Sequence, residues 1–525
     1  MKHLSTLILA FLAGNAFAIG NMIPSESPKQ TMNTWCTWES QWQGVVDLRK
    51  ALKEGKNVPE GIAKAPEKLT QRDGITEHAI FGENGWAHNF GDLRSDMYFI
   101  LDDGWDVDFY EEPWTKDISK FGSHIPHNKR FPSVAGKSPK EKLKWINNKL
   151  VALGWRGGAI WIPAQMFPQK KWITPEAQID FWKERIGWSK YAGIKYWKVD
   201  WGIHCHDVKW RKMLTELAKK EYPDLIIEHA YPIHINGSQC FTNGLEVKDG
   251  KAFGGSSIAN TPKNQLKDYC EILGFSEIFR TYDTIGKATT LDRMAYELLV
   301  GRKNNYNTYI TCELNPELAA GLACYFGEMR RPQNPASKHI VAFLRWQRIA
   351  PALPINATDV KVSQERLTDI FTHEDIPEYP PFKNVKAPQS APAIVVRGDL
   401  DLPKVSVEKG KEKPFVVATL HPNKTLCISF VKRRKNIDSP ADAQFNIDCA
   451  NRKIGVFGTF NTLEFNLKNN SNNTKVWIQD LLTNTPIELK NFEIKDNKLK
   501  INFANISLSG DKNSHPAFIL FVESK

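Results

Sequence analysis

Short apolar segments alternate with helical stretches along the chain from about residue 30 to 350. This alternation is typical of strand–helix units whose strands lie parallel in one sheet. Eight such strands within about 320 residues fit an α/β fold, and we expect a (β/α)8 TIM barrel over residues 30–350. The expected strands are 32–38, 97–103, 157–163, 196–200, 225–229, 277–281, 308–313 and 323–328.

A region with a different pattern follows. After about residue 385, short strands separated by turn residues predict a C-terminal antiparallel β-sandwich over 385–525. Tryptophan use changes too, because 16 of the 17 tryptophans lie at or before Trp346 and only Trp477 follows. Frequent prolines disfavour continuous regular structure over 351–384, which we interpret as a connecting segment.

The amino terminus has the composition of a secretory signal. Lys2 and His3 precede an apolar run from Leu4 to Leu12, and Ala16-Phe-Ala18 is a small-x-small cleavage pattern. No later apolar run approaches the roughly 18 to 20 residues that span a bilayer. We therefore expect a signal peptide over 1–18, no membrane span, and a secreted or periplasmic protein.

The cysteines are too sparse for a disulfide scaffold, since eight are spread over 525 residues without a CxxC pair. An exported protein is free to form disulfides, and the favoured pair is Cys427 with Cys449.

The formal net charge of +11 is compatible with an anionic partner such as a sulfated or uronate-bearing glycan. Lysines are nevertheless spread along the whole chain, and the densest basic run, Lys432–Lys435, is more typical of a solvated loop. The sequence contains no nucleic-acid-binding motif, so that class of partner is not expected.

Two of the expected strands end in aspartate beside tryptophan, within Met97–Trp105 and Tyr196–Gly202. In a parallel barrel the carboxyl ends of the strands carry the active site. Carboxylates bind or attack sugars, while indole faces stack on the C–H side of the ring. The pattern indicates a carbohydrate-active enzyme.

Glycoside hydrolysis with retention needs two carboxyl groups about 5 to 5.5 Å apart, one a nucleophile and the other an acid that later acts as base. Asp200 is the candidate nucleophile, because a strand delivers it and Lys198 points to the same side. Asp283 is the candidate proton donor, with Arg280 nearby to bind substrate or hold a carboxylate. The alternatives are a helix cap or ion pair for Asp200 and a loop cap for Asp283.

Other side chains at the strand ends are candidates for substrate binding. Asp102 and Asp103 are expected to hold hydroxyls, although adjacent strand residues face opposite ways and only one reaches the pocket unless the strand bends. One or two of four tryptophans are expected to line the sugar site and the others to pack in the core: Trp35, Trp105, Trp161 and Trp201.

The segment His204-Cys-His-Asp207 contains residue types that bind zinc. We prefer a simpler interpretation, in which Asp207 caps the following helix and His204 contacts the pocket. No metal or cofactor is expected.

Three motifs carry a family resemblance. Asn33-Thr-Trp35 resembles the first-strand segment of the clan D glycoside hydrolases, the α-galactosidase families 27 and 36. Leu101-Asp-Asp-Gly-Trp105 is similar to their second-strand segment, and Lys198-Val-Asp200 to their Lys-x-Asp nucleophile segment. The resemblance implies a retaining exo-acting enzyme with Asp200 as nucleophile and Asp283 as acid/base, and with four residues around the terminal sugar: Asp102, Asp103, Lys198 and Arg280.

Some positions depart from the family pattern. Arg280 and Asp283 are three residues apart, where family 27 usually has four, and Trp201–His206 lacks the usual continuation after the nucleophile strand. Glu228 falls where family 27 reads the 2-substituent of the sugar, so Glu228 is expected to bind a 2-hydroxyl. These differences leave the sugar open.

The resulting hypothesis is a secreted retaining exo-α-glycosidase of the α-galactosidase type, acting on an oligosaccharide or polysaccharide. Within the same fold, the alternatives are another pyranose, such as a β-L-arabinopyranoside or an α-N-acetylgalactosaminide, or glycosyl transfer to a second sugar. Alternatives of another class are a noncatalytic glycan-binding protein and a metal-dependent hydrolase centred on His204 and His206.

Overall fold

The computed structural model describes most of the chain. The described residues are 19–56, 58–59, 62, 65–111, 114–115, 118–119, 121–167, 173–231, 246–248, 251–253, 258, 261, 263–281, 286–330, 337–372, 386–433, 440–468, 473–503 and 517–524.

Eight parallel strands close into a barrel in the spatial order β1-β12-β11-β10-β7-β6-β5-β2. Each strand is short and buried on both faces, and the apolar residues within it are the signal by which the sequence predicted all eight. The predicted TIM barrel is confirmed. Its strands are β1 (Asn33–Cys36), β2 (Met97–Leu101), β5 (Gly157–Ile162), β6 (Tyr196–Val199), β7 (Ile226–Ala230), β10 (Ile278–Thr281), β11 (Tyr309–Glu313) and β12 (Tyr325–Glu328).

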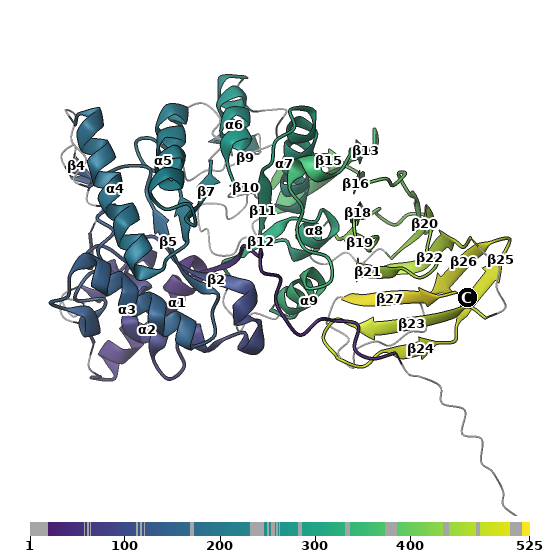
Figure 1. The fold of residues 1–525 in the computed structure, drawn as a ribbon, viewed down its shortest axis with the longest axis horizontal. Coiled ribbons are helices and arrows are strands. Elements are labelled where there is room, and N and C mark those ends of the chain that lie inside the picture. Colours follow the sequence, from purple (N-terminus) through teal and green to yellow (C-terminus); the bar gives the residue numbers. More distant parts are fainter. Residues whose placement is uncertain are drawn as a thin grey trace, which may run out of the picture.

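Helices cover the outside of the barrel (Figure 1), and one follows each barrel strand in the described chain. Local signals set their ends: the Thr174 side chain accepts from Ala177 N at 3.2 Å, and Gly193 ends the same helix at φ 74°. The helices are α1 (Trp38–Lys53), α3 (Pro139–Ala152), α4 (Pro175–Ala192), α5 (Val208–Glu221), α6 (Lys263–Phe275), α7 (Gly286–Lys303), α8 (Pro316–Gly321) and α9 (Ser337–Gln347).

Shorter elements decorate the barrel. They are α2 (Glu77–Phe81), the 3-10 helices η2 (Pro66–Lys68), η3 (Gln71–Gly74), η4 (Trp86–His88), η5 (Gly91–Asp96), η6 (Pro132–Val134) and η8 (Ile355–Ala357), and the ribbons β3 (Trp114–Thr115) with β4 (Ile118–Ser119) and β8 (Glu246–Lys248) with β9 (Lys251–Phe253).

The barrel interior is apolar at the amino ends of the strands. Tyrosines near the starts of four strands fill this end, with ring centres 5.4 Å apart for Tyr98 and Tyr196 and 5.1 Å apart for Tyr309 and Tyr325. This filling leaves the carboxyl ends as the place where polar side chains gather.

The C-terminal region consists of two β-sheets with an apolar core of its own between them. The larger sheet contains, in spatial order, β13 (Val360–Val362), β16 (Ile394–Arg397), β18 (Phe415–Leu420), β19 (Leu426–Val431), β21 (Lys453–Gly458), β27 (Ala517–Glu523), β23 (Lys475–Asp480) and β24 (Ile487–Leu489). The smaller sheet contains β17 (Lys404–Val407), β20 (Ala441–Asp448), β22 (Phe460–Asn466), β26 (Lys498–Asn502) and β25 (Phe492–Lys495).

These sheets are mixed rather than purely antiparallel. The pairs β16–β18, β19–β21 and β20–β22 are parallel, while the other neighbouring pairs are antiparallel. Side-chain alternation predicts a strand but not the direction of its partner, which explains the difference. The connecting segment begins with η8, β13 and β14 (Arg366–Thr372), and β14 pairs with β15 (Lys386–Pro392).

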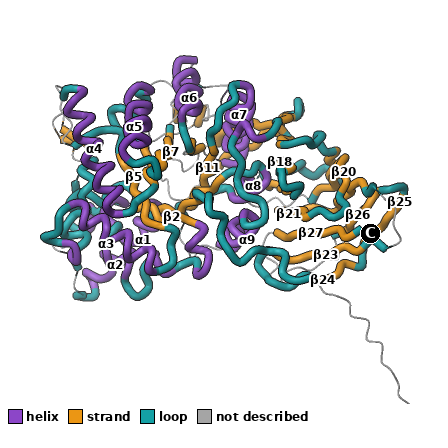
Figure 2. The backbone as a smooth tube through the Cα atoms, in the orientation of Figure 1, coloured by secondary structure: helices purple, strands orange, loops and turns teal. Residues whose placement is uncertain are grey.

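The larger sheet packs against α8 and α9 of the barrel, and the two regions lie side by side in Figures 1 and 2. The approach is close: a Cβ added at Gly321 would lie 2.3 Å from a methyl of Val417, and one at Gly455 would lie 2.6 Å from the Trp346 ring. Thr419 Oγ1 also donates to the Gly321 carbonyl at 2.7 Å. Barrel and sheet therefore share one tightly packed interface.

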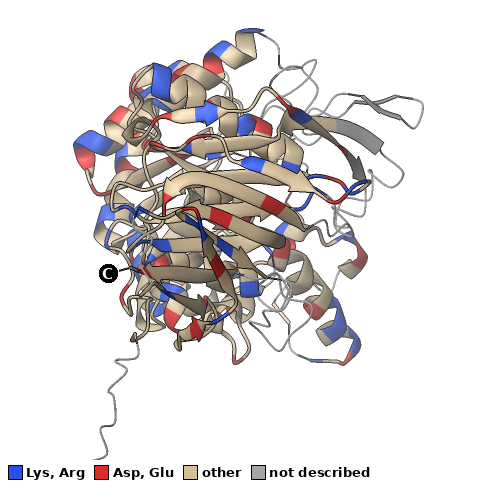
Figure 3. Ribbon diagram, turned by 90° about the vertical axis from the view of Figure 1, so that its right-hand side faces the viewer, with Lys and Arg blue, Asp and Glu red and all other residues tan. Residues whose placement is uncertain are grey.

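The seven cysteines in the described part of the chain are free, so the expected Cys427–Cys449 disulfide is not formed. Both thiols are buried in the C-terminal region. No helix within the described ranges is long and apolar enough to cross a membrane. Acidic and basic residues are interspersed over the face drawn in Figure 3.

The barrel–sheet interface generates a stability prediction. Gly455→Ala places a methyl group against the Trp346 ring, so we expect a loss of about 1–3 kcal/mol in the free energy of unfolding. Gly187→Ala, in the exposed middle of α4 with no atom within 4 Å of the added Cβ, is the control and is expected to be neutral or stabilising. Urea unfolding measures both; equal stability of the two variants would contradict close packing at this interface.

Candidate active site

The barrel brings predicted site residues from four strands to its carboxyl end. Strand alternation turns Lys198 and the following Asp200 inward from β6, Glu228 from β7 and Arg280 from β10, while Asp102 follows β2. All five residues are at most 3% exposed. Charged groups this deeply buried need partners, and the barrel supplies them as two networks.

Lys198 lies at the centre of the first network. Its Nζ is 3.0 Å from Asp102 Oδ2 and 3.4 Å from Asp200 Oδ2. Burial by itself lowers the pKa of the ammonium, but the Asp102 carboxylate, aided by Asp200, outweighs burial and raises the Lys198 pKa well above its ordinary value. Lys198 is therefore a permanent positive charge between two carboxylates.

Asp200 is held by one oxygen only. Its Oδ2 accepts the indole N–H of Trp161 at 2.8 Å in addition to the Lys198 contact. Its Oδ1 is buried and has no hydrogen-bond partner among the described residues. Asp200 therefore has one oxygen that is held in place and one that remains available for a further interaction.

The two neighbouring aspartates after β2 have different surroundings. Asp102 accepts the Lys198 ammonium and the Cys36 thiol, whose Sγ lies 2.8 Å from Oδ2. Asp103 turns instead to Arg72, whose Nε is 2.8 Å from Oδ2. Burial raises the pKa of Asp103 to about 7, and the Arg72 charge partly opposes this shift. Asp102 thus faces the barrel centre, and Asp103 lies at its rim.

Arg280 organises the second network. Its guanidinium contacts Glu228 at 2.9 Å, Glu313 at 2.8 Å and the Thr34 hydroxyl at 3.2 Å. Burial opposes the charge, but the two carboxylates raise the Arg280 pKa well above its ordinary value. An added Cβ at Gly327 would lie 2.5 Å from Nη1, so only glycine leaves room for this guanidinium.

The predicted tryptophans separate into two groups. Trp161 faces the barrel interior, and Trp201 packs beside it with ring centres 5.5 Å apart. Trp35 is fully buried outside the barrel, where its ring lies 4.9 Å from that of Phe99 in an aromatic cluster. Trp105 is also buried, and its indole N–H donates to the Trp161 carbonyl at 3.0 Å. Of these four tryptophans, Trp161 and Trp201 are the pair beside Asp200, since the Trp161 indole donates to Asp200 Oδ2 and Trp201 packs on Trp161.

His204 and Asp207 are explained by the start of α5. Asp207 Oδ1 accepts from Trp210 N at 3.0 Å, which is the N-cap expected from the sequence. His204 stacks on the Trp210 ring at 5.3 Å and contacts Asp207 at 3.1 Å. Within the described ranges, no three His, Cys, Asp or Glu side chains are grouped to hold a metal ion.

Asp283, the candidate acid, lies outside the described residues. The strand that leads to it is anchored from behind by Glu297 of α7, which accepts from Thr281 Oγ1 at 2.7 Å and from the Tyr269 hydroxyl. Thr281 is the last residue of β10 and precedes Asp283 by two positions. The described part of the site thus ends in a fixed strand terminus.

Sequence reasoning missed several polar neighbours of the site. Glu313 is the last residue of β11 and Cys36 the last residue of β1, and both face inward, so strand alternation alone contained the signal for them. Trp38, the last residue of the expected strand 32–38 and the first residue of α1, packs partly exposed against the interior apolar cluster. Arg72 comes from η3, about thirty residues before Asp103, and no local pattern indicated it.

Comparisons with known proteins give structural matches only. No family model matches this chain, and no curated protein matches its sequence. A GH27 β-L-arabinopyranosidase from Geobacillus stearothermophilus is 10% identical, with a TM-score of 0.41 over 94% of this chain and 96% of that chain. α-Galactosidase I from Mortierella vinacea is 10% identical, with a TM-score of 0.35 over 98% and 99%. The α-galactosidase from Saccharomyces cerevisiae, solved with raffinose, is 8% identical, with a TM-score of 0.39 over 88% and 82%.

All three of these structures are named as glycosidases. At identities of 8–10% and TM-scores of 0.35–0.41, the likeness assigns neither an activity nor a substrate to this chain.

The anchor beneath β10 generates a pH prediction. Burial raises the pKa of Glu297 to about 7, although bonds from Tyr269 and Thr281 oppose the shift. The folded state therefore binds a proton more tightly than the unfolded state does. The contribution of Glu297 to stability is full below about pH 4.5 and falls by about 3 kcal/mol as the pH rises through 7.

Glu297→Gln keeps an acceptor but removes this titration, so its free energy of unfolding should vary less between pH 5 and pH 8 than that of the wild type. Urea unfolding at several pH values measures the difference, with the exposed Glu216→Gln as control. An unchanged wild-type slope in Glu297→Gln would contradict the assignment.

Proposed function

We propose that this protein is a secreted retaining exo-α-glycosidase of the α-galactosidase type, which forms a covalent glycosyl-enzyme on Asp200. One observation carries the proposal: Asp200 is 3% exposed, with Oδ2 held by Trp161 and Lys198 and Oδ1 without a partner in the described chain. A buried carboxylate with an unspent oxygen is costly for folding and useful for attack at an anomeric carbon.

In the proposed first step, Asp200 Oδ1 attacks the anomeric carbon, and the bond between that carbon and the leaving oxygen breaks. Asp283 gives its proton to the leaving oxygen, which departs as an alcohol. In the second step, water attacks the same carbon, the bond from that carbon to Asp200 Oδ1 breaks, and Asp283 takes a proton from the attacking water. The sugar is released with its configuration retained, and Asp200 is regenerated as a carboxylate. The roles of Asp283 come from its place after β10 and from the motif resemblance. The chemistry needs no metal or cofactor.

The remaining site residues bind the terminal sugar in this proposal. Lys198 and Arg280 donate to hydroxyl oxygens, while the carboxylates accept from hydroxyl groups. The Trp161 and Trp201 rings, 5.5 Å apart, offer apolar faces to the C–H side of the pyranose. The side chains proposed to contact substrate are Asp102, Asp103, Trp161, Lys198, Trp201, His204, Glu228 and Arg280.

The nucleophile assignment is tested with aryl α-D-galactopyranoside and β-L-arabinopyranoside donors. Asp200→Asn should lose several orders of magnitude in kcat with either donor that the wild type hydrolyses, because the amide is a poor nucleophile. Asp180→Asn, on an exposed turn of α4, is the control and should retain full activity.

Azide added to Asp200→Gly should restore aryl release and give a glycosyl azide of inverted configuration, which a merely structural aspartate would not produce. If Asp200→Asn turned over a donor at the wild-type rate, that result would contradict the mechanism. Saccharide binding by the wild type without turnover of any donor would favour a noncatalytic glycan-binding protein.

Export is a further part of the proposal, supported by the composition of residues 1–18. When the full chain is expressed in a bacterial host, the mature protein should accumulate outside the cytoplasm and begin after Ala18. Intact-mass measurement of the purified protein checks the cleavage site. An uncleaved protein retained in the cytoplasm would contradict this prediction.

A further inference from the structure

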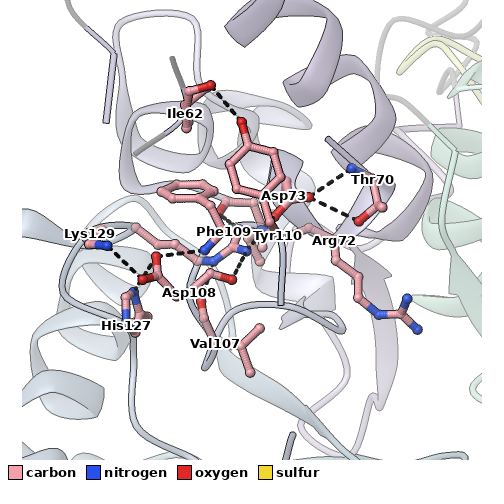
Figure 4. A network of polar contacts seen from close by, with 12 residues as sticks. Ile62, Thr70, Arg72, Asp73, Val107, Asp108, Phe109, Tyr110, His127 and Lys129 are labelled. Atoms are coloured by element: carbon pink, nitrogen blue, oxygen red, sulfur yellow. Dashed lines mark hydrogen bonds and ion pairs between the residues drawn. The ribbon is translucent and has the colours of Figure 1, made fainter. Parts of the chain in front are cut away.

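The 3-10 helix η3 is a rigid platform beside the barrel mouth, and Figure 4 shows the polar contacts that hold it. Asp73 accepts from Tyr110 N at 3.0 Å and from the fully buried Arg130 guanidinium at 3.0 Å. Arg130 Nη1 also donates to the Arg72 carbonyl at 2.9 Å. The buried Arg130 guanidinium therefore holds the backbone of residue 72 as well as the Asp73 side chain.

The Arg72 side chain extends away from this network (Figure 4). Its Nε donates to Asp103 Oδ2 at 2.8 Å, and its guanidinium carbon lies 5.3 Å from the Phe121 ring centre and 5.7 Å from that of Trp201. The side chain is 17% exposed, so the cation reaches solvent between two aromatic rings.

Both members of the Arg72–Asp103 pair have hydrogen-bonding groups without a partner in the described chain. Within the described chain, the Arg72 Nη1 and Nη2 groups have no hydrogen-bond partner. Asp103 Oδ1 is buried and has no partner there either. The pair therefore presents donors and an acceptor side by side, although Asp103 is only 2% exposed.

Two separate chains of contacts connect this pair to Asp200. On one side, Trp201 lies against Trp161, which donates to Asp200 Oδ2 at 2.8 Å. On the other side, Asp103 N donates to Asp102 Oδ1 at 2.8 Å, and Asp102 shares Lys198 with Asp200. The unspent groups of Arg72 and Asp103 thus belong to the wall of the candidate active site.

We propose that Arg72 is a specificity-determining residue that, with Asp103, binds two neighbouring hydroxyl groups of the substrate. This inference rests on the proposed glycosidase function. Arg72 Nη groups donate to the oxygen of one hydroxyl, and Asp103 Oδ1 accepts the proton of the next. A carboxylate alone only accepts hydrogen bonds from hydroxyl groups. The ion pair both donates and accepts, so it selects a vicinal diol and rejects a sugar that lacks either hydroxyl.

The test compares Arg72→Gln and Arg72→Lys with wild type on the best aryl glycoside donor and on its monodeoxy analogues. Arg72→Gln should lose about 10- to 100-fold in kcat/KM, mainly through KM, because a charge-assisted bond to substrate is lost. Arg72→Lys keeps the ion pair with Asp103 but lacks the planar set of donors, so it should show an intermediate loss even if Arg72→Gln folds poorly.

The deoxy donors separate recognition from a structural effect. Removing the hydroxyl that Arg72 binds should lower kcat/KM of the wild type by about 10-fold or more, because the same charge-assisted bond is lost. The same removal should change kcat/KM of Arg72→Gln little, because that variant lacks the bond already. Arg49→Gln is the matched control, because Arg49 of α1 donates to the carbonyls of Pro66 and Leu69 and not to Asp103. It should leave kcat/KM and the deoxy series unchanged.

Equal sensitivity of wild type and both Arg72 variants to every deoxy donor would overturn the proposal, as would a loss confined to uronide donors. If the wild type turns over no donor, the proposed glycosidase function is wrong. Saccharide binding by wild type and Arg72→Lys is then measured by tryptophan fluorescence. Weaker binding by Arg72→Lys would support the diol site; equal binding, or no binding by the wild type, would overturn it.

Discussion

Two buried cations hold the carboxyl end of the barrel together. Lys198 lies between Asp102 and Asp200, and Arg280 lies between Glu228 and Glu313. Removing water from these charges is costly, and the cost is offset only when every partner is in place. The register of the strands therefore has to be correct before the networks can form. Once formed, they fix the carboxylates in advance of any ligand, which is what a preorganised site requires.

The same barrel separates packing from chemistry. Tyrosines fill its amino end, while the charged side chains gather at its carboxyl end. Packing and the placement of charge depend on each other at Gly327, because any larger residue there would displace the Arg280 guanidinium. Around the mouth, polar groups without a partner in the described chain belong to several residues: Asp200, Asp103, Arg72, Glu228 and His204. Their distribution suits a polyhydroxylated ligand held at several points.

The accuracy of the sequence predictions follows from how local each signal is. All eight barrel strands were predicted because a strand buried on both faces is rich in apolar residues, which is a signal contained within the strand itself. The C-terminal strands were predicted by alternation, but three parallel pairings were not, since alternation contains no information about the neighbouring strand. Trp35 and Trp161 look alike in sequence, yet one packs outside the barrel and the other inside, because their positions differ in strand phase.

The sequence by itself determined the strands, the helix caps and the aspartates at the strand ends, because each depends on residues within a few positions of one another. Only the tertiary structure decided which of Asp102 and Asp103 faces the centre, that Glu313 and Cys36 join the charged networks, and that Arg72 reaches Asp103 from a separate loop. These contacts join residues far apart in the chain. Closure of the barrel brings them within hydrogen-bonding distance, and no local pattern of residues encodes that closure.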